Sequence, residues 1–99
     1  MTNIKAIRSA ASRLKGYVRE TPILTSPFLD EIAGKNIYVK AESLQHTGSF
    51  KFRGGWSAIS EMSEKKRKNG VLAISSGNHA QGVANAARAF NTRSVIIMP

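Results

Sequence analysis

The C-terminal part of this sequence alternates between strand and helix patterns, and this alternation limits the possible folds more than any other feature. Residues 71–75 and 94–98 are short apolar runs typical of buried strands, and residues 78–90 between them have helical spacing. Strands joined by such a crossover are expected to lie parallel. Parallel sheets are normally covered on both faces. The pattern therefore predicts the α/β class, as an incomplete doubly wound parallel sheet that opens a larger domain.

The rest of the chain also carries helix and strand signals. The expected elements are helices over residues 3–15, 26–34 and 50–68, strands over 21–24 and 36–41, and a loop over 42–49. The long helix has an apolar stripe that we expect in the core, made of Phe52, Trp56, Ile59 and Met62. The helix over 78–90 groups further residues on one side: His79, Val83, Ala86, Ala87 and Phe90.

The net charge is +9, because 15 lysines and arginines are balanced by only 6 acidic residues. Clustered cations can bind nucleic acid by displacing its counterions. The densest run, residues 65–68, precedes Asn69 and Gly70, where a helix should stop, and cations stabilise that end of a helix. We interpret the run as a solvated helix end and do not expect a nucleic-acid partner.

The first twenty residues are basic and amphipathic. Such a segment is typical of an organelle transit peptide, but its apolar residues also recur at helical spacing. We interpret it as the first helix of the fold. No secretory signal is visible, and we expect a cytoplasmic protein. We expect no membrane partner, since no apolar run is long enough to span a bilayer.

Lys51 lies at the start of the predicted helix over 50–68. A lysine condenses with a carbonyl only as the neutral amine, and a helix N-terminus or a nearby cation such as Arg53 favours that form. The alternative is an ordinary surface lysine. Position alone favours the ordinary surface lysine.

A second candidate site is the SSGNH segment at residues 75–79, where a strand gives way to a helix. Unpaired backbone N–H groups at a helix start attract anions. The same residue types also serve as a plain helix cap. Taken alone, the segment is therefore a weak signal for an anion site.

Other residues are weaker candidates. His46 and His79 are far apart in sequence, with no cysteine in the chain, so we expect no metal site. Gly54 and Gly55 are expected to allow close helix packing. Glu42 is expected to be a structural hydrogen-bonding partner.

The segments ESLQHTGSFKFRG at residues 42–54 and SSGNH at residues 75–79 closely resemble those of the serine and threonine dehydratase family. This family belongs to fold type II of the pyridoxal-phosphate (PLP) enzymes, which have a tryptophan synthase β-like fold, and it includes serine racemases. Alanine is more common in the family where this chain has Gly55. That departure is expected to affect packing more than chemistry.

The resemblance implies a role for each matching residue. Lys51 would form the Schiff base with PLP, Phe50 would lie against the pyridine ring, and Asn78 would contact the ring hydroxyl. The substrate carboxylate would be bound by the loop residues Ser75, Ser76, Gly77, Asn78 and His79. Serine racemases carry a serine where this chain has Ser76, and there it is the acid and base on the face opposite the lysine.

The implied activity is α,β-elimination from threonine or serine, giving a 2-oxo acid and ammonia. Racemisation by Lys51 and Ser76 is the alternative, and a non-catalytic truncated product is another. Residues 1–68 would belong to the large PLP domain and residues 69–99 to the start of the small domain. In family members, the glycine-rich cup for the PLP phosphate and the partner of the pyridine nitrogen come later in the sequence than the part that matches this chain. We therefore expect an N-terminal piece of a longer, homo-oligomeric enzyme, inactive alone.

Overall fold

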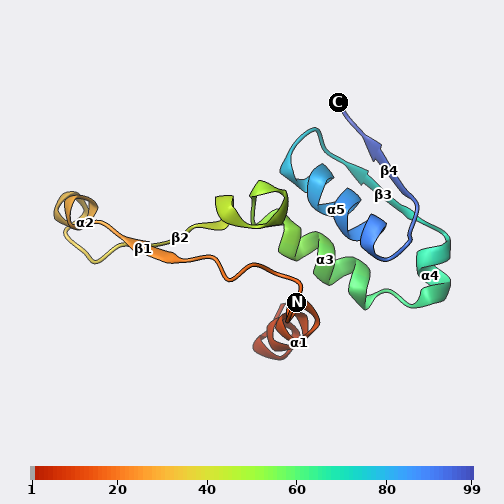
Figure 1. Ribbon diagram of the computed structural model, residues 1–99, viewed down its shortest axis with the longest axis horizontal. Coiled ribbons are helices and arrows are strands. Elements are labelled where there is room, and N and C mark those ends of the chain that lie inside the picture. Colours follow the sequence, from red (N-terminus) through yellow and green to blue (C-terminus); the bar gives the residue numbers. More distant parts are fainter. Residues whose placement is uncertain (1) are drawn as a thin grey trace.

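A computed structural model describes residues 2–99, and they form an elongated molecule with principal extents of 52 × 34 × 26 Å. The body contains two neighbouring helices and a parallel strand pair, while a thin arm projects from it (Figure 1). The first helix, α1 (Ile4–Leu14), packs against the body and begins after Asn3, whose side chain accepts from the Ala6 N–H. The fold thus separates into a packed part and an exposed part.

The predicted strand–helix–strand unit is confirmed in the body. Strands β3 (Val71–Ile74) and β4 (Ser94–Ile97) are parallel, and α5 (Asn78–Ala89) connects them. Ala73 and Ile96 point to the core that α5 covers, whereas Leu72 and Ile74 are 66% and 68% exposed on the opposite face. The structure has one covered sheet face, as expected of an incomplete doubly wound sheet.

The single helix predicted over residues 50–68 is wrong, because the structure divides it. Helix α3 (Lys51–Glu61) ends at Met62, and α4 (Glu64–Lys68) begins after Ser63. The Ser63 hydroxyl accepts from the Lys66 N–H at 3.4 Å and so caps a new helix. The basic run forms the end of α4, as predicted.

The core lies between α1, α3 and α5. Phe52, Trp56 and Ile59 of α3 are buried and Met62 is partly buried, which confirms the predicted stripe. The Trp56 ring lies 4.6 Å from that of Tyr17 and 5.0 Å from that of Phe90, measured between centroids. Of the residues grouped on one side of α5, Val83, Ala86 and Ala87 are buried, but His79 is exposed. This core joins residues on both sides of the predicted domain boundary at 68/69, and the division stays a prediction.

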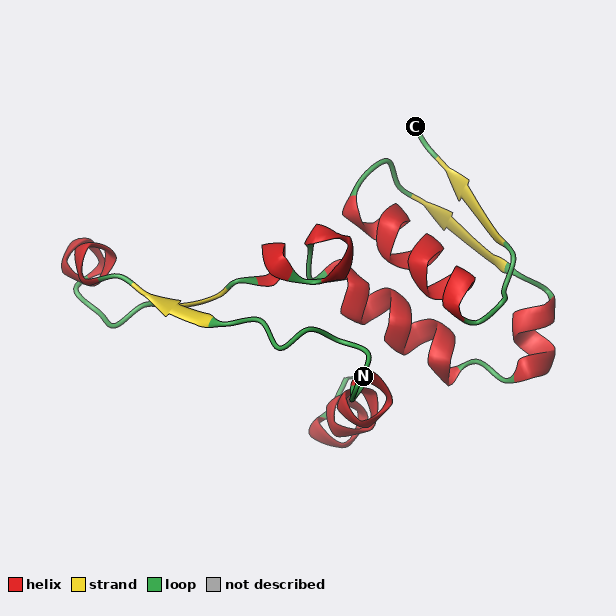
Figure 2. Cartoon of the chain, in the orientation of Figure 1, coloured by secondary structure: helices red, strands yellow, loops and turns green. Residues whose placement is uncertain are grey.

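The arm consists of β1 (Ile23–Thr25), α2 (Pro27–Ala33) and β2 (Tyr38–Lys40) (Figure 2). The two strands are antiparallel and shorter than predicted. Ser26 caps α2 and Gly34 ends it with φ of 62°, as the sequence indicated. The expected loop after β2 contains two 3₁₀ turns, η1 (Glu42–Leu44) and η2 (His46–Gly48). No helix among residues 2–99 combines the length and the apolar character needed to cross a membrane.

Candidate functional site

Lys51 is the first residue of α3, and the side chain of Ser49 fixes its backbone N–H. The buried Ser49 hydroxyl accepts from the Lys51 N–H at 3.3 Å. The Lys51 side chain is half-buried, and its Nζ lies 5.2 Å from the centroid of the Phe50 ring. That ring is itself 60% exposed. An amine and an aromatic face are therefore available together at one helix start.

The second predicted segment follows the carboxyl end of β3. The Gly77 N–H donates to the Ser75 hydroxyl at 3.2 Å, which tightens the turn into α5. Gly77 caps this helix and has no side chain to accept from the N–H groups of the first turn. Ser76, Asn78 and His79 are exposed there. This end of α5 can accept an anion, which would compete with Ser75 for the Gly77 N–H.

The two predicted segments are brought together by α3 and α5, which lie side by side and run in the same direction (Figure 1). The contact is between backbones: a methyl group added to Gly82 of α5 would lie 2.5 Å from the Lys51 carbonyl oxygen. Gly82 is one helical turn beyond Asn78. The turn that carries the lysine therefore lies next to the helix start that carries the anion segment.

Gln45 supports this arrangement and was missed by the sequence reasoning. Its side chain is 2% exposed. The amide oxygen accepts from the backbone N–H groups of Arg19 at 2.9 Å and His46 at 3.0 Å, and the amide nitrogen donates to the Arg19 carbonyl at 2.9 Å. A buried amide with all these bonds fixes the loop before Lys51 to the chain after α1.

Thr47 lies in the same loop with an unusual backbone. Its φ is 60° and its ψ is 12°, a left-handed conformation that is rare for a β-branched residue. Its buried hydroxyl has no hydrogen-bond partner among the residues that the structure describes. Such a conformation costs about 1–3 kcal/mol, so the bonds of Gln45 and Ser49 must hold this turn in place.

Glu42 and Arg53 form an ion pair beside the site. Arg53 donates to both Glu42 carboxylate oxygens, from Nε at 2.7 Å and from Nη2 at 2.8 Å. These bonds, with one from the Thr21 hydroxyl, lower the pKa of Glu42 from 4.5 to about 2 against the opposing effect of burial. The predicted structural role of Glu42 is confirmed. The expectation that Arg53 acts on Lys51 is not supported, because the guanidinium charge is compensated by Glu42.

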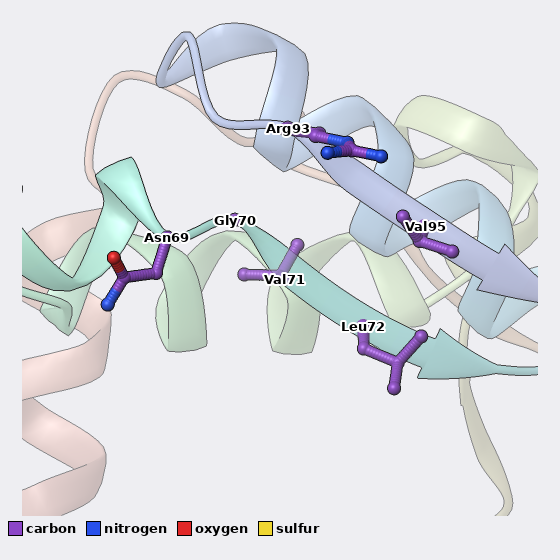
Figure 3. A pocket seen from close by; sticks show the side chains of 6 residues that line it. All are labelled: Asn69, Gly70, Val71, Leu72, Arg93 and Val95. Atoms are coloured by element: carbon purple, nitrogen blue, oxygen red, sulfur yellow. The ribbon is translucent and has the colours of Figure 1, made fainter.

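A hollow elsewhere on the molecule is unrelated to these residues. It has a volume of about 290 Å³ and is lined by Asn69, Gly70, Val71, Leu72, Arg93 and Val95 (Figure 3). These residues lie at the amino ends of β3 and β4. The segment at residues 75–77 follows the opposite, carboxyl end of β3, which is where ligands bind in open α/β sheets.

Known proteins resemble this chain over nearly its whole length. The sequence model of the family described as pyridoxal-phosphate dependent enzyme matches residues 14–99. Over 90 residues the chain is 52% identical to the L-threo-3-hydroxyaspartate ammonia-lyase of a Pseudomonas species, covering 91% of this chain and 28% of that protein. It is 48% identical over 99 residues to the L-threonine ammonia-lyase of Thermotoga maritima, covering 100% of this chain and 25% of that protein.

A solved structure shows the same arrangement of elements. The crystal structure of serine racemase from Dictyostelium discoideum matches with a TM-score of 0.93 and 39% sequence identity. The match covers 99% of this chain and 32% of that chain. The chain thus spans less than a third of the length of each of these three relatives.

Proposed function

This chain belongs to the family of pyridoxal-phosphate dependent enzymes, and from this premise we propose that it supplies the lysine and the carboxylate-binding loop of an ammonia-lyase. The substrate class is a β-hydroxy amino acid, such as threonine, serine or 3-hydroxyaspartate, in line with the names of its relatives. The observation that carries the proposal is the backbone contact between Lys51 and Gly82. It puts a lysine beside the start of α5, where an amino acid's carboxylate can bind.

The residues present fit PLP in three respects. Lys51 offers an amine to its aldehyde, the exposed Phe50 ring offers a face for the pyridine ring, and Asn78 offers an amide to the ring hydroxyl. When bound, PLP supplies an electron sink for the pair left on Cα after its proton leaves.

The proposed work of the chain follows from these positions. The exposed N–H groups at the start of α5 and the Ser75 hydroxyl bind the substrate carboxylate. The Lys51 amine, released from the aldehyde when the substrate's own amino group binds there, would take the proton from Cα as general base. Loss of that proton and of hydroxide from Cβ is loss of one water. The enamine left takes up one water, giving a 2-oxo acid and ammonia.

Racemisation is a second candidate, favoured by the exposed Ser76 in the same turn and by the likeness to serine racemase. A racemase needs a second proton donor, on the face of Cα opposite the lysine. Ser76 is proposed for that step. Ser76→Ala should then abolish formation of the D-amino acid while ammonia release continues.

The test uses the complete gene product. Purified protein is incubated with PLP, reduced with borohydride and digested, and the modified lysine is identified by mass spectrometry. We expect modification at Lys51, its loss in Lys51→Ala, and its retention in Lys35→Ala, a matched exposed lysine in the arm. Failure to modify Lys51 would refute the proposal. Ammonia and 2-oxo acid formation from each candidate amino acid then identifies the substrate.

A further inference from the structure

We propose that Gly82 is a positioning residue for Lys51, an inference that rests on the proposed function. Because residue 82 has no side chain, the backbone of the lysine turn can lie directly on α5. The contact fixes the distance between the amine-bearing turn and the anion segment that begins the same helix. The contact sets this distance without requiring Lys51 and the anion segment to touch each other.

The contact distances leave no room for a side chain at residue 82. A methyl group there would lie 2.5 Å from the carbonyl oxygen of Lys51, 2.9 Å from its carbonyl carbon and 3.3 Å from the Phe52 nitrogen. All three are backbone atoms at the start of α3, so no side-chain rotation can relieve the overlap. Ordinary contact begins near 3.5 Å. Relief therefore requires movement of the lysine turn away from α5 by about 1 Å.

A second glycine makes the opposing contact. A methyl group on Gly55 of α3 would lie 2.6 Å from the Gly82 carbonyl oxygen. This overlap is nearly as severe, but it falls one helical turn beyond Lys51. Gly54, its neighbour, differs completely: a methyl group there would meet no atom within 4 Å among the described residues. Gly55 and Gly54 therefore provide two control positions for Gly82→Ala.

The consequence for chemistry follows from the size of the movement. A displacement of about 1 Å in a reacting group can cost on the order of 100-fold in rate. Gly82→Ala overlaps the backbone of the lysine turn itself, whereas Gly55→Ala overlaps the Gly82 carbonyl from a position one turn further along α3. Both should destabilise the core, but only the first should impair capture of an aldehyde by Lys51 at equal folded fraction.

The experiment compares Gly82→Ala, Gly55→Ala and Gly54→Ala in the complete gene product. The readouts are the rate at which PLP becomes trapped on Lys51 by borohydride, the absorbance of the bound cofactor, and the urea midpoint, with rates corrected for the folded fraction. We expect Gly82→Ala to slow capture at least about tenfold. The capture rate of Gly55→Ala should stay within about threefold of the parent rate, although this variant loses a comparable amount of stability. Gly54→Ala should match the parent protein in both capture rate and stability.

Two results would overturn the inference: capture by folded Gly82→Ala at the parent rate, or equal loss of capture in Gly82→Ala and Gly55→Ala. Absence of capture by the parent protein refutes the proposed function instead. If Gly82→Ala does not fold, amide hydrogen exchange of the parent protein tests the positioning role of Gly82 instead. The Phe52 amide should then exchange in the same opening event as Val83, and an independent, faster opening of the lysine turn would contradict the proposal.

Discussion

Glu42→Gln should destabilise the protein by an amount that depends on pH. In the folded state the pKa of Glu42 is about 2, below its ordinary value of 4.5, chiefly because Arg53 donates two hydrogen bonds to the carboxylate. A lowered folded pKa means that the charged form contributes stability above pH 4.5 and loses that contribution as the pH falls toward 2. The glutamine variant has no carboxylate and lacks this dependence.

The size of the effect follows from the two pKa values. At about 1.4 kcal/mol per pH unit between them, the charged Glu42 contributes about 3 kcal/mol. The side chain is 15% exposed, so solvent screens the pair only partly. The difference in unfolding free energy between the parent protein and Glu42→Gln should be about 3 kcal/mol at neutral pH, about 1.4 at pH 3 and below about 0.5 at pH 2.

Urea unfolding of both proteins at several pH values measures this difference. Glu64→Gln is the matched control, because Glu64 pairs with Lys68 at 3.3 Å while both side chains are at least 75% exposed. Such a surface pair contributes less than about 0.5 kcal/mol. If Glu42→Gln costs the same at pH 2 as at neutral pH, or no more than Glu64→Gln, the linkage between this ion pair and folding is wrong.

Other substitutions test the supports of the site and core. Gln45→Ala should lower the free energy of unfolding in urea by about 3 kcal/mol, since it removes three hydrogen bonds of a buried amide, two of them to the N–H and carbonyl of Arg19; a cost equal to that of exposed Gln81→Ala would contradict this. Trp56→Ala should cost about 3–5 kcal/mol and remove much of the near-ultraviolet circular dichroism, and an unchanged thermal midpoint would argue against its place in the core. Ser49→Ala should cost about 1 kcal/mol by removing the hydroxyl that accepts at the start of α3, and no measurable loss would mean that water replaces it.

Local signals explain most of what the sequence predicted correctly. Ser26 and Gly34 bound α2 because a capping hydroxyl and a left-handed glycine act within a few residues. The stripe of Phe52, Trp56 and Ile59 marked the core because helical spacing alone puts these residues on one face. The break at Ser63 was missed because helix-favouring residues continue on both sides of it, and the capping hydroxyl was not weighed against them.

The supports of the site depend on partners far away in the sequence. Gln45 could be recognised only with Arg19 in view, since a buried amide and an exposed one look alike in a sequence. Gly82 gave no signal, because its contact with Lys51 depends on how α3 and α5 pack. Glu42 was correctly predicted to be structural, but its pairing with Arg53, eleven residues away, was not predicted.

The arm has a consequence for how the molecule comes apart. None of the residues in β1, α2 or β2 is buried, and only one short antiparallel ladder joins its strands. Opening the arm therefore breaks few apolar contacts, whereas opening the body exposes the buried core around Trp56. A protease should nick the peptide between β1 and β2 long before it cuts α3 or α5. We expect the arm to open at a lower temperature than the body.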